Sequence, residues 1–363
     1  MFESKILTTN DQKEWHEILH RHNFADVNYL PEYLTIFEKE TNMAPFTSFG
    51  GKGQLFVFGD SNNQIIYPFF KRNISDLSFS DDNTKNMFDI ISPYGYGGPI
   101  ALADLESNEE LWKNYFSSFD SYCKSENIVS EFCRLQPYFR NQGPVSKYSN
   151  GTVIKSGQVV YIDLTLSEDA LLAEMIKGHR RKICKALNSS DIQFNTDVSP
   201  ESPNIFFNIY SENMQRVGAS EKYFFSQTFF NSVFKYLENT ICFGRITYQG
   251  NDCSVLITLA AGEVAYAWLS GTKADYMSIN PNNIIMYQSM IRLKKEGFKV
   301  LIMGGGRGNL ADSLYSFKAG FSPLNLDFYI YKKIHLQAEY NKLVELRNLK
   351  APIEQFFPLY RLE

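Results

Sequence analysis

A short apolar run that ends in glycines constrains this chain more than any other stretch. Val300 to Met303 is apolar, and four glycines follow between Gly304 and Gly308. Glycine reaches positive φ angles that other residues avoid, so such a loop can turn several backbone N–H groups toward one point. That geometry suits an anion or a developing oxyanion. A tight strand-to-helix turn that binds nothing explains the same residues, and both interpretations stay open on this stretch alone.

The length of the chain favours two structural units. At 363 residues it is longer than one hydrophobic core usually supports. With 44% hydrophobic and 21% charged residues the composition is that of a soluble globular protein, and 22 Tyr and 30 Phe supply both core and stacking surfaces. A net charge of −4 argues against a general nucleic-acid binder, so no DNA partner is expected, while a local basic patch leaves a transfer-RNA open as a partner.

Cysteine usage and hydropathy predict a cytoplasmic protein. The five cysteines are odd in number and form no C-x-x-C pair, so neither a disulfide framework nor a thiolate zinc site is expected. Residues 1–15 contain no apolar segment of the kind found in a secretory signal. The longest apolar stretch, 255–269, is interrupted and too short to span a bilayer, so we expect peripheral membrane contact at most.

Hydrophobic periodicity predicts the same order of elements twice. The first half is expected to contain helices at 11–21 and 31–39, a hairpin at 54–59 and 64–70, a strand at 88–92, a glycine and tyrosine turn at 93–99, a helix at 109–125 and a strand at 128–135. The second is expected to contain helices at 204–217 and 226–238, a hairpin at 241–248 and 253–260, a strand at 263–269, a glycine-containing turn at 270–272, a helix at 282–296 and a strand at 300–303.

The remaining segments connect or close these halves. A linker rich in Gly, Asn and Ser is predicted at 141–151, strand-like runs around Gly157, and a helix at 167–187 broken near Gly178. A strand at 325–331 and a mostly polar helix at 336–349 end the chain. The order indicates a duplicated α/β unit.

One motif points to a different class of protein. Residues 16–20 match the H-E-x-x-H pattern of zinc metalloproteases through His16, Glu17 and His20, and Asp26 could serve as a third ligand. So short a pattern arises by chance, and no sheet is predicted before this helix to support a metal. We therefore expect the two histidines on a solvated helix face and no metal site, and we keep a zinc metalloprotease as a minor alternative.

Four segments in this order resemble the FemAB-like aminoacyltransferases, which are tandem acetyltransferase-like (GNAT-like) proteins. The segments are Ser-Pro-Tyr-Gly-Tyr-Gly-Gly-Pro at 92–99, His-Arg-Arg-Lys-Ile-Cys-Lys-Ala at 179–186, Tyr-Ala-Trp-Leu-Ser-Gly at 266–271 and Tyr-Ser-Phe-Lys-Ala-Gly-Phe at 315–321. The resemblance implies an α/β fold with mixed sheets. It also implies two tandem GNAT-like units, which we place at 1–150, on the acceptor side, and at 151–363, with the acyl-transfer site.

The resemblance implies an N-acyltransferase. In this family an acyl or aminoacyl group passes from a transfer-RNA ester, or in relatives from a thioester, to the amine of a peptidoglycan precursor or an amino sugar. We therefore expect acyl-CoA or aminoacyl-tRNA as co-substrate, no permanently bound cofactor, and a small-molecule or nucleotide-linked precursor of the cell envelope, including its polysaccharides, as acceptor. The alternative is a non-catalytic module of the same fold that binds a glycan or a protein.

The resemblance assigns catalytic roles near the glycine loop. Lys318 would place a positive charge beside the reacting ester or thioester, and Tyr315 would protonate the leaving group. Independently of the resemblance, the guanidinium group of Arg307, beside Gly305 and Gly306, suits bidentate binding of a substrate carboxylate or phosphate. Each residue also has a simpler interpretation, as a solvated lysine, a core tyrosine or an arginine that caps a helix.

Further candidates come from other segments. Phe317, Lys222 and Tyr266 are expected to bind substrate. Arg180, Arg181 and Lys185 form a basic cluster on the helix 177–187, with Ile176, Ile183 and Leu187 expected on its packing side. That cluster suits the phosphates of a nucleotide or CoA, and a solvated charged face explains it equally well.

Overall fold

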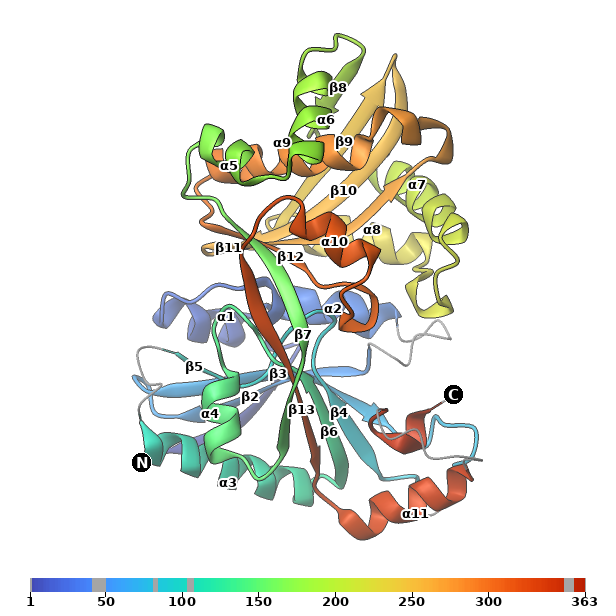
Figure 1. Cartoon of the computed structure of the whole chain (residues 1–363). Helices are drawn as coiled ribbons and strands as arrows, with labels where there is room; N and C mark the ends of the chain where they lie inside the picture. Colours follow the sequence, from blue (N-terminus) through green and yellow to red (C-terminus); the bar gives the residue numbers. More distant parts are fainter. Residues whose placement is uncertain (1, 41–49, 81–83, 103–107, 349–355, 363) are drawn as a thin grey trace. The chain divides into compact units, whose positions relative to one another are not determined.

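The chain forms two compact units. The computed structural model describes residues 2–40, 50–80, 84–102, 108–348 and 356–362 (Figure 1). Unit 1 comprises Met1–Phe24, Asn28–Ser156 and Phe328–Glu363, and unit 2 comprises Ala25–Val27 and Gly157–Asp327.

The sheet of unit 1 is mixed. Its strand order is β1 (Glu3–Thr8), β2 (Lys52–Gly59), β3 (Gln64–Asn73), β4 (Phe88–Ile91), β6 (Ile128–Arg134) and β13 (Asn325–Ile334), and β5 (Ile100–Leu102) pairs with β3. The predicted hairpin is confirmed, because β2 and β3 pair antiparallel. β4 and β6 are parallel. Strands whose residues are buried on both sides, such as Leu55 to Phe58 in β2, need helices on both faces of the sheet.

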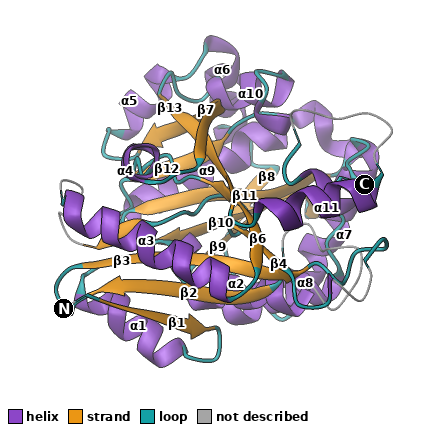
Figure 2. Ribbon diagram, turned by 90° about the horizontal axis from the view of Figure 1, so that it is seen from below, coloured by secondary structure: helices purple, strands orange, loops and turns teal. Residues whose placement is uncertain are grey.

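Helices cover both faces of that sheet. α3 (Glu109–Ser125) lies on one face, and α1 (Gln12–Arg21) and α2 (Pro31–Glu40) lie on the other, as Figures 1 and 2 show. α3 has the boundaries that the sequence predicts, because Asn108 caps its first turn by accepting a hydrogen bond from the Leu111 amide at 3.0 Å. Its buried apolar stripe packs against Phe56, Tyr67 and Phe69 of the sheet.

The strands of unit 2 belong to the same continuous sheet and are also mixed in direction. Their order is β7 (Thr152–Asp163), β12 (Val300–Gly304), β11 (Val264–Thr272), β10 (Asn251–Ala261), β9 (Ile241–Tyr248) and β8 (Ile192–Asn195). The core contains residues of α5 (Glu168–Glu174), α6 (Lys177–Leu187) and α9 (Pro281–Lys295). α7 (Ser202–Arg216) packs on β10 and β11 and on α8 (Gln227–Tyr236), and α10 (Ser313–Ala319) follows β12.

The division into units differs from the predicted one at 1–150 and 151–363. The last part of the chain, from Phe328 onward, packs with unit 1, because β13 pairs antiparallel with β6 between Ile330 and Ile334. α11 (Gln337–Arg347) then buries Tyr340 and Leu343 against Val129 of the same unit. β7 and β13 therefore each contribute residues to both units.

Other segments also differ from the sequence prediction. The expected linker at 141–151 contains a helix, α4 (Gln142–Tyr148), because Val145 is fully buried against α3 and the sheet. The strands β1, β5 and β8 were not predicted. The helix expected at 167–187 breaks at Met175 and Ile176, which have extended ψ angles, and Gly178 lies inside α6.

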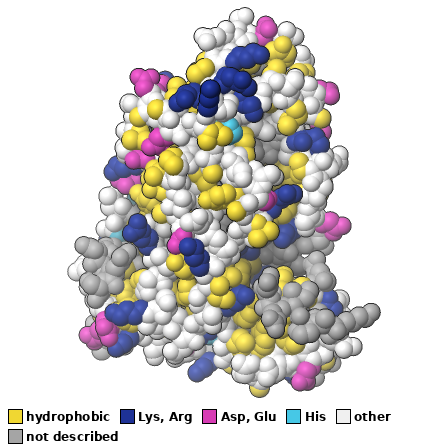
Figure 3. All heavy atoms as spheres, viewed as in Figure 1, with side chains coloured by type: hydrophobic (Ala, Val, Ile, Leu, Met, Phe, Trp, Pro, Cys, Tyr) yellow, Lys and Arg dark blue, Asp and Glu magenta, His cyan; other side chains and the backbone are white. Residues whose placement is uncertain are grey.

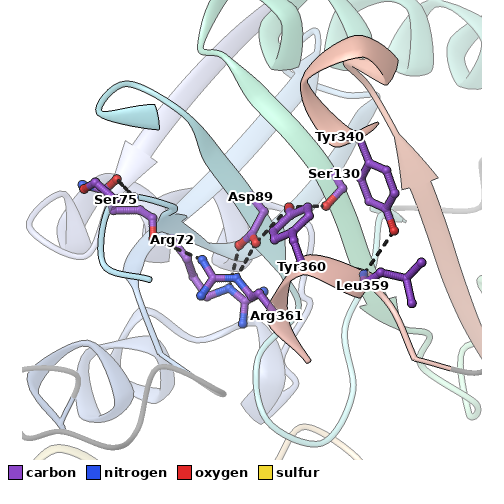
Figure 4. A network of polar contacts seen from close by, with 9 residues as sticks. Arg72, Ser75, Asp89, Ser130, Tyr340, Leu359, Tyr360 and Arg361 are labelled. Atoms are coloured by element: carbon purple, nitrogen blue, oxygen red, sulfur yellow. Dashed lines mark hydrogen bonds and ion pairs between the residues drawn. The ribbon is translucent and has the colours of Figure 1, made fainter. Parts of the chain in front are cut away.

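A buried ion cluster fixes the end of the chain in unit 1. The carboxylate of Asp89 accepts hydrogen bonds from the guanidinium groups of Arg72, at 2.7 Å, and Arg361 (Figure 4). The hydroxyl of Tyr360 donates to the same carboxylate at 3.1 Å and lies 2.7 Å from the Ser130 hydroxyl. Burial raises the pKa of Asp89, but the two arginines outweigh it and hold that pKa below the ordinary value.

No helix in the described part of the chain is long and apolar enough to cross a membrane.

Candidate active site

The two central strands of unit 2 separate after a short parallel pairing. β11 and β12 pair only from Val264–Val300 to Tyr266–Ile302. In the described pairings β11 continues from Ala267 to Thr272 beside β10 alone, while β12 keeps its antiparallel pairing with β7, with an irregularity between Ile302 and Gly304. Strand backbone groups that a ladder leaves unpaired need another partner, so the point of separation is a place where a ligand can pair with the main chain.

The glycine loop leads from that point into α10. Gly304 has a φ angle of 82° and Gly308 one of 59°, as glycine permits. Gly306 is required for a different reason, since a Cβ atom there would lie 2.0 Å from the carbonyl oxygen of Leu310. The loop is therefore closed tightly on itself, as the sequence predicts for a strand-to-helix turn.

A carboxylate of the chain lies where the glycine loop was expected to receive an anion. Asp312 caps α10, and its Oδ1 accepts a hydrogen bond from the Tyr315 amide at 3.0 Å. Its Oδ2 accepts from the backbone amide of Arg307 at 3.3 Å and from Arg307 Nε at 2.9 Å. The side-chain hydrogen bond from Arg307, followed by that from the Tyr315 amide, lowers the pKa of Asp312 to about 2, so this carboxylate is charged at neutral pH.

Lys318 lies in the last turn of α10 and points back to the same loop. Its Nζ donates a hydrogen bond to the carbonyl oxygen of Gly305 at 2.7 Å. Burial lowers the pKa of Lys318 from 10.5 to about 8, and the charge of Asp312 offsets only part of this effect. A lysine with this pKa is mostly charged at pH 7 and titrates near the physiological range.

α6 supports α10 through a histidine. His179 is buried, and its Nε2 lies 2.9 Å from the carbonyl oxygen of Phe317. Its ring contacts Phe317 and Phe321, with centroids 5.2 Å and 4.5 Å away. Burial lowers the pKa of His179, which favours the neutral ring. Gly320 is close to the same ring, since a Cβ atom there would lie 2.5 Å from His179 Nε2.

The structure brings together Arg307, Gly305, Gly306, Tyr315, Phe317 and Lys318. Tyr315 and Phe317 are partly buried and pack on the core of unit 2, so their roles toward a substrate stay predictions. Tyr266 is buried in β11, and its hydroxyl donates to the carboxylate of Asp26. Lys222 is exposed on the 3-10 turn Glu221–Tyr223, with its Nζ 5.4 Å from the ring centroid of Tyr223.

The basic cluster of α6 faces away from α10. Arg180, Arg181 and Lys185 are exposed, whereas His179, Ile183 and Ala186 form the buried side of the helix. The prediction that Ile176 and Leu187 belong to the packing side is wrong, because they are 53% and 46% exposed. Arg181 lies two residues after His179, which corresponds to about 200° around the helix, so this cation points away from the Lys318 loop.

The H-E-x-x-H segment lacks the surroundings of a metal site. His16 Nε2 lies 2.6 Å from Glu32 Oε1, and His20 is exposed. Among the described residues no group of three or more His, Cys, Asp or Glu side chains is placed to hold a metal ion. The expectation that no sheet precedes this helix is wrong, since β1 does; the carboxylate of Asp26, the suggested third ligand, pairs with Tyr266.

In unit 1 the parallel strands β4 and β6 do not separate in the way that β11 and β12 do in unit 2. After the parallel pairing of β4 and β6, the turn 93–99 returns to form a bridge between Gly97 and Leu135. The side chain of Asn141 binds the carbonyl oxygens of Gly97 and Pro99, at 2.9 Å and 3.2 Å. The hydroxyl of Tyr29 donates to the carbonyl oxygen of Gly98 at 2.9 Å. The two units therefore differ where a ligand could enter between strands.

Three residues of this region are not assigned to it by the sequence prediction. Asp312 could have been found as a helix cap, since an aspartate directly before a helix start is a common signal. His179 was noted only as part of a motif, and no local signal shows that it meets α10. Asp26 precedes the sheet of unit 2 by more than a hundred residues, so its contact with Tyr266 depends on the tertiary fold.

Comparisons with known proteins concern the domain type and the fold of the chain. Residues 173–318 match the family model of the acetyltransferase (GNAT) domain, and Lys318 is the last residue matched. The solved structure of FemX superimposes with a TM-score of 0.69 over 94% of this chain and 99% of its own, at 11% identity. The chain has the FemX fold. No curated protein matches its sequence.

Two further structures share the fold. One is the C-terminal domain of a putative lysylphosphatidylglycerol synthetase from Agrobacterium fabrum, with a TM-score of 0.57, 12% identity and coverage of 92% of this chain and 96% of its own. The other is a conserved protein of unknown function from Bacteroides thetaiotaomicron, with a TM-score of 0.56, 9% identity and coverage of 92% and 99%. The predicted α/β fold and the resemblance to FemAB-like proteins are confirmed at the level of the fold, and a GNAT domain is confirmed for residues 173–318; that unit 1 is also GNAT-like stays a prediction.

Proposed function

We propose that the protein is an N-acyltransferase whose reaction takes place in unit 2, at the separation of β11 and β12. The observation that carries this proposal is the position of Lys318, a half-buried lysine with a pKa of about 8 beside the loop that follows β12. The GNAT domain match supports acyl transfer as the type of reaction. The closed bridge at Gly97 in unit 1 supports unit 2 as the reacting half, and we propose unit 1 as the acceptor side.

The chemistry needs little from the protein beyond positioning and charge. The amine nitrogen of the acceptor attacks the acyl carbonyl carbon, the carbonyl oxygen becomes an oxyanion, and the bond to the leaving thiol or ribose hydroxyl then breaks. Lys318 as an ammonium group stabilises the oxyanion. The amine releases a proton and the leaving group takes one up, and Tyr315 is proposed to donate it. No covalent intermediate with the enzyme is required.

The donor and acceptor follow from chemistry and from the relatives. We propose acyl-CoA or aminoacyl-tRNA as co-substrate, without a permanently bound cofactor, and an amine of an envelope precursor as acceptor. The proposed acceptors are peptidoglycan and amino-sugar intermediates. The fold shared with FemX and with a domain of a putative lysylphosphatidylglycerol synthetase supports transfer to a molecule of the envelope, and the amine as accepting group is part of our proposal. Arg307, Gly305, Gly306, Phe317, Lys222 and Tyr266 remain the proposed substrate-binding residues.

The test is transfer of a labelled acyl group. Purified protein is incubated with labelled acetyl-CoA or labelled aminoacyl-tRNA and a panel of amine-bearing envelope precursors, and acylated acceptor is measured. Lys318→Met should lower the rate by about 10²–10³, as loss of one oxyanion donor does in other acyl transfers. Lys235→Met, at an exposed lysine of α8, is the matched control and should keep the rate.

A second function is favoured by one observation. Lys318 binds the carbonyl oxygen of Gly305 and Arg307 binds Asp312, so polar groups of the site already have partners within the chain. A loop whose polar groups are hydrogen-bonded within the chain is what a non-catalytic module that binds a glycan or a protein would keep. That alternative predicts no transfer with either donor, and unchanged partner binding in Lys318→Ala.

A further inference from the structure

The exposed face of α6 has an unusual charge distribution. Five of the eleven residues of α6 are cations, and the helix contains no acidic residue. We name the four exposed cations the α6 basic face; they are Lys177, Arg180, Arg181 and Lys185, whereas Lys182 is half-buried. Figure 3 shows Lys and Arg side chains gathered over this part of unit 2. Among the described residues no ion pair engages any of them, although the chain as a whole has a net charge of −4.

The arrangement of these cations does not suit a single phosphate group. Lys177, Arg181 and Lys185 are spaced four residues apart along the exposed face, so they extend over about 12 Å of helix. The face is convex, because α6 turns its other side, with Ile183 and Ala186, to the core. Side chains that diverge from a convex surface cannot converge on one small anion, whereas an extended anionic surface can meet all of them.

Exposed aliphatic side chains accompany the cations. Ile176, which directly precedes α6, is 53% exposed, and Leu187, its last residue, is 46% exposed. Arg180 lies between them on the same edge of the helix, because 176, 180 and 187 are separated by four and seven residues. Aliphatic groups gain little from a solvated nucleic acid backbone, but they gain free energy by entering the boundary between lipid headgroups and acyl chains.

We propose that the α6 basic face docks unit 2 onto an anionic phospholipid surface. Ile176 and Leu187 insert at the headgroup level, and the cations pair with lipid phosphates. Each Lys or Arg near such a surface contributes about 1 kcal/mol, which corresponds to about fivefold in affinity. The proposal concerns the exposed side of α6 and does not rest on acyl transfer by the Lys318 loop.

The test is sedimentation of the full chain with lipid vesicles. Vesicles of phosphatidylcholine alone are compared with vesicles of phosphatidylcholine and phosphatidylglycerol in equal amounts, at low and high salt. The protein should bind only the anionic vesicles, and less at high salt. Replacement of Lys177, Arg181 and Lys185 by Gln should weaken binding about a hundredfold, from three factors of about five.

Two further variants separate lipid binding from simpler effects. The control variant has Gln in place of three exposed lysines of unit 1, which are Lys13, Lys113 and Lys124. It loses as much positive charge as the α6 variant and should bind vesicles nearly as well as the wild type. Ser at Ile176 and Leu187 should weaken vesicle binding several-fold without a change in charge. Circular dichroism of each variant checks that it is folded.

The proposal is overturned by any of three results. These are no binding of the wild type to anionic vesicles, equal vesicle binding by the Lys177/Arg181/Lys185 variant, and binding of the wild type to bulk transfer-RNA but not to vesicles. The last result would assign the α6 basic face to RNA. Because vesicle binding is measured without donor or acceptor, its outcome is independent of whether acyl transfer is observed.

Discussion

Substitution of Lys318 by methionine should remove a residue that destabilises the folded protein at neutral pH. Burial lowers the pKa of Lys318 from 10.5 to about 8. That difference corresponds to about 3 kcal/mol, which the folded state loses by holding the charged form. The hydrogen bond to the Gly305 carbonyl returns about 1.5 kcal/mol. At pH 7 Lys318→Met should therefore be about 1–2 kcal/mol more stable than the wild type.

The sign of the pH dependence follows from the lowered pKa. Between about pH 8 and 10.5 the unfolded chain binds a proton at Lys318 that the folded chain has released. Stability of the wild type therefore rises with pH across this range relative to Lys318→Met, and the advantage of the variant disappears by about pH 10.5. A lysine that stabilised the fold would show the opposite sign.

The assay is urea unfolding of both proteins at pH 7 and near pH 10.5, followed by circular dichroism. Lys235→Met serves as control, since Lys235 is exposed on α8, and its difference from the wild type should not change with pH. The reasoning is refuted if Lys318→Met is less stable than the wild type by more than about 1 kcal/mol at pH 7, or if the difference between the two proteins is the same at both pH values.

Three further substitutions test the site and its support. Gly306→Ala should lower the free energy of unfolding by about 2 kcal/mol, because the new Cβ would meet the carbonyl oxygen of Leu310. Gly143→Ala is the control and should be tolerated, because no atom lies within 4 Å of the new Cβ. Thermal unfolding of the two variants compares them. Asp312→Ala should lower the free energy of unfolding by about 1 kcal/mol, because α10 loses its cap. Hydrogen exchange of the Tyr315 amide should then become faster, and an unchanged exchange rate would contradict the capping role. Asp89→Asn should lower the free energy of unfolding by about 3–5 kcal/mol, because two buried arginines lose their counter-charge. A smaller decrease, measured by urea unfolding, would argue against the buried cluster.

The sequence predicted those parts of the fold that depend on local signals. The periodicity of α3, the polar turn between β2 and β3, and the glycines after Met303 each specify their own conformation within a few residues. The candidate site was found for the same reason, since Arg307, Tyr315 and Lys318 lie within one strand–loop–helix segment.

The features that were missed depend on contacts between distant segments. α4 forms because Val145 is buried and Asn141 binds the turn 93–99, although its composition is typical of a linker. The packing side of α6 was assigned by apolar residue type, but it is set by His179, which meets α10 some 140 residues later. Ile176 and Leu187 are therefore exposed, and this exposure became visible only in the structure.

The central claim is that unit 2 transfers an acyl group at the Lys318 loop. Its most direct test is the appearance of N-acylated acceptor from labelled acetyl-CoA or aminoacyl-tRNA, measured for the wild type, Lys318→Met and Lys235→Met under the same conditions. The account predicts transfer from at least one donor by the wild type and the Lys235 variant, and a rate about 10²–10³ lower for Lys318→Met. Equal rates for all three proteins, or no transfer from either donor across the acceptor panel, would contradict it.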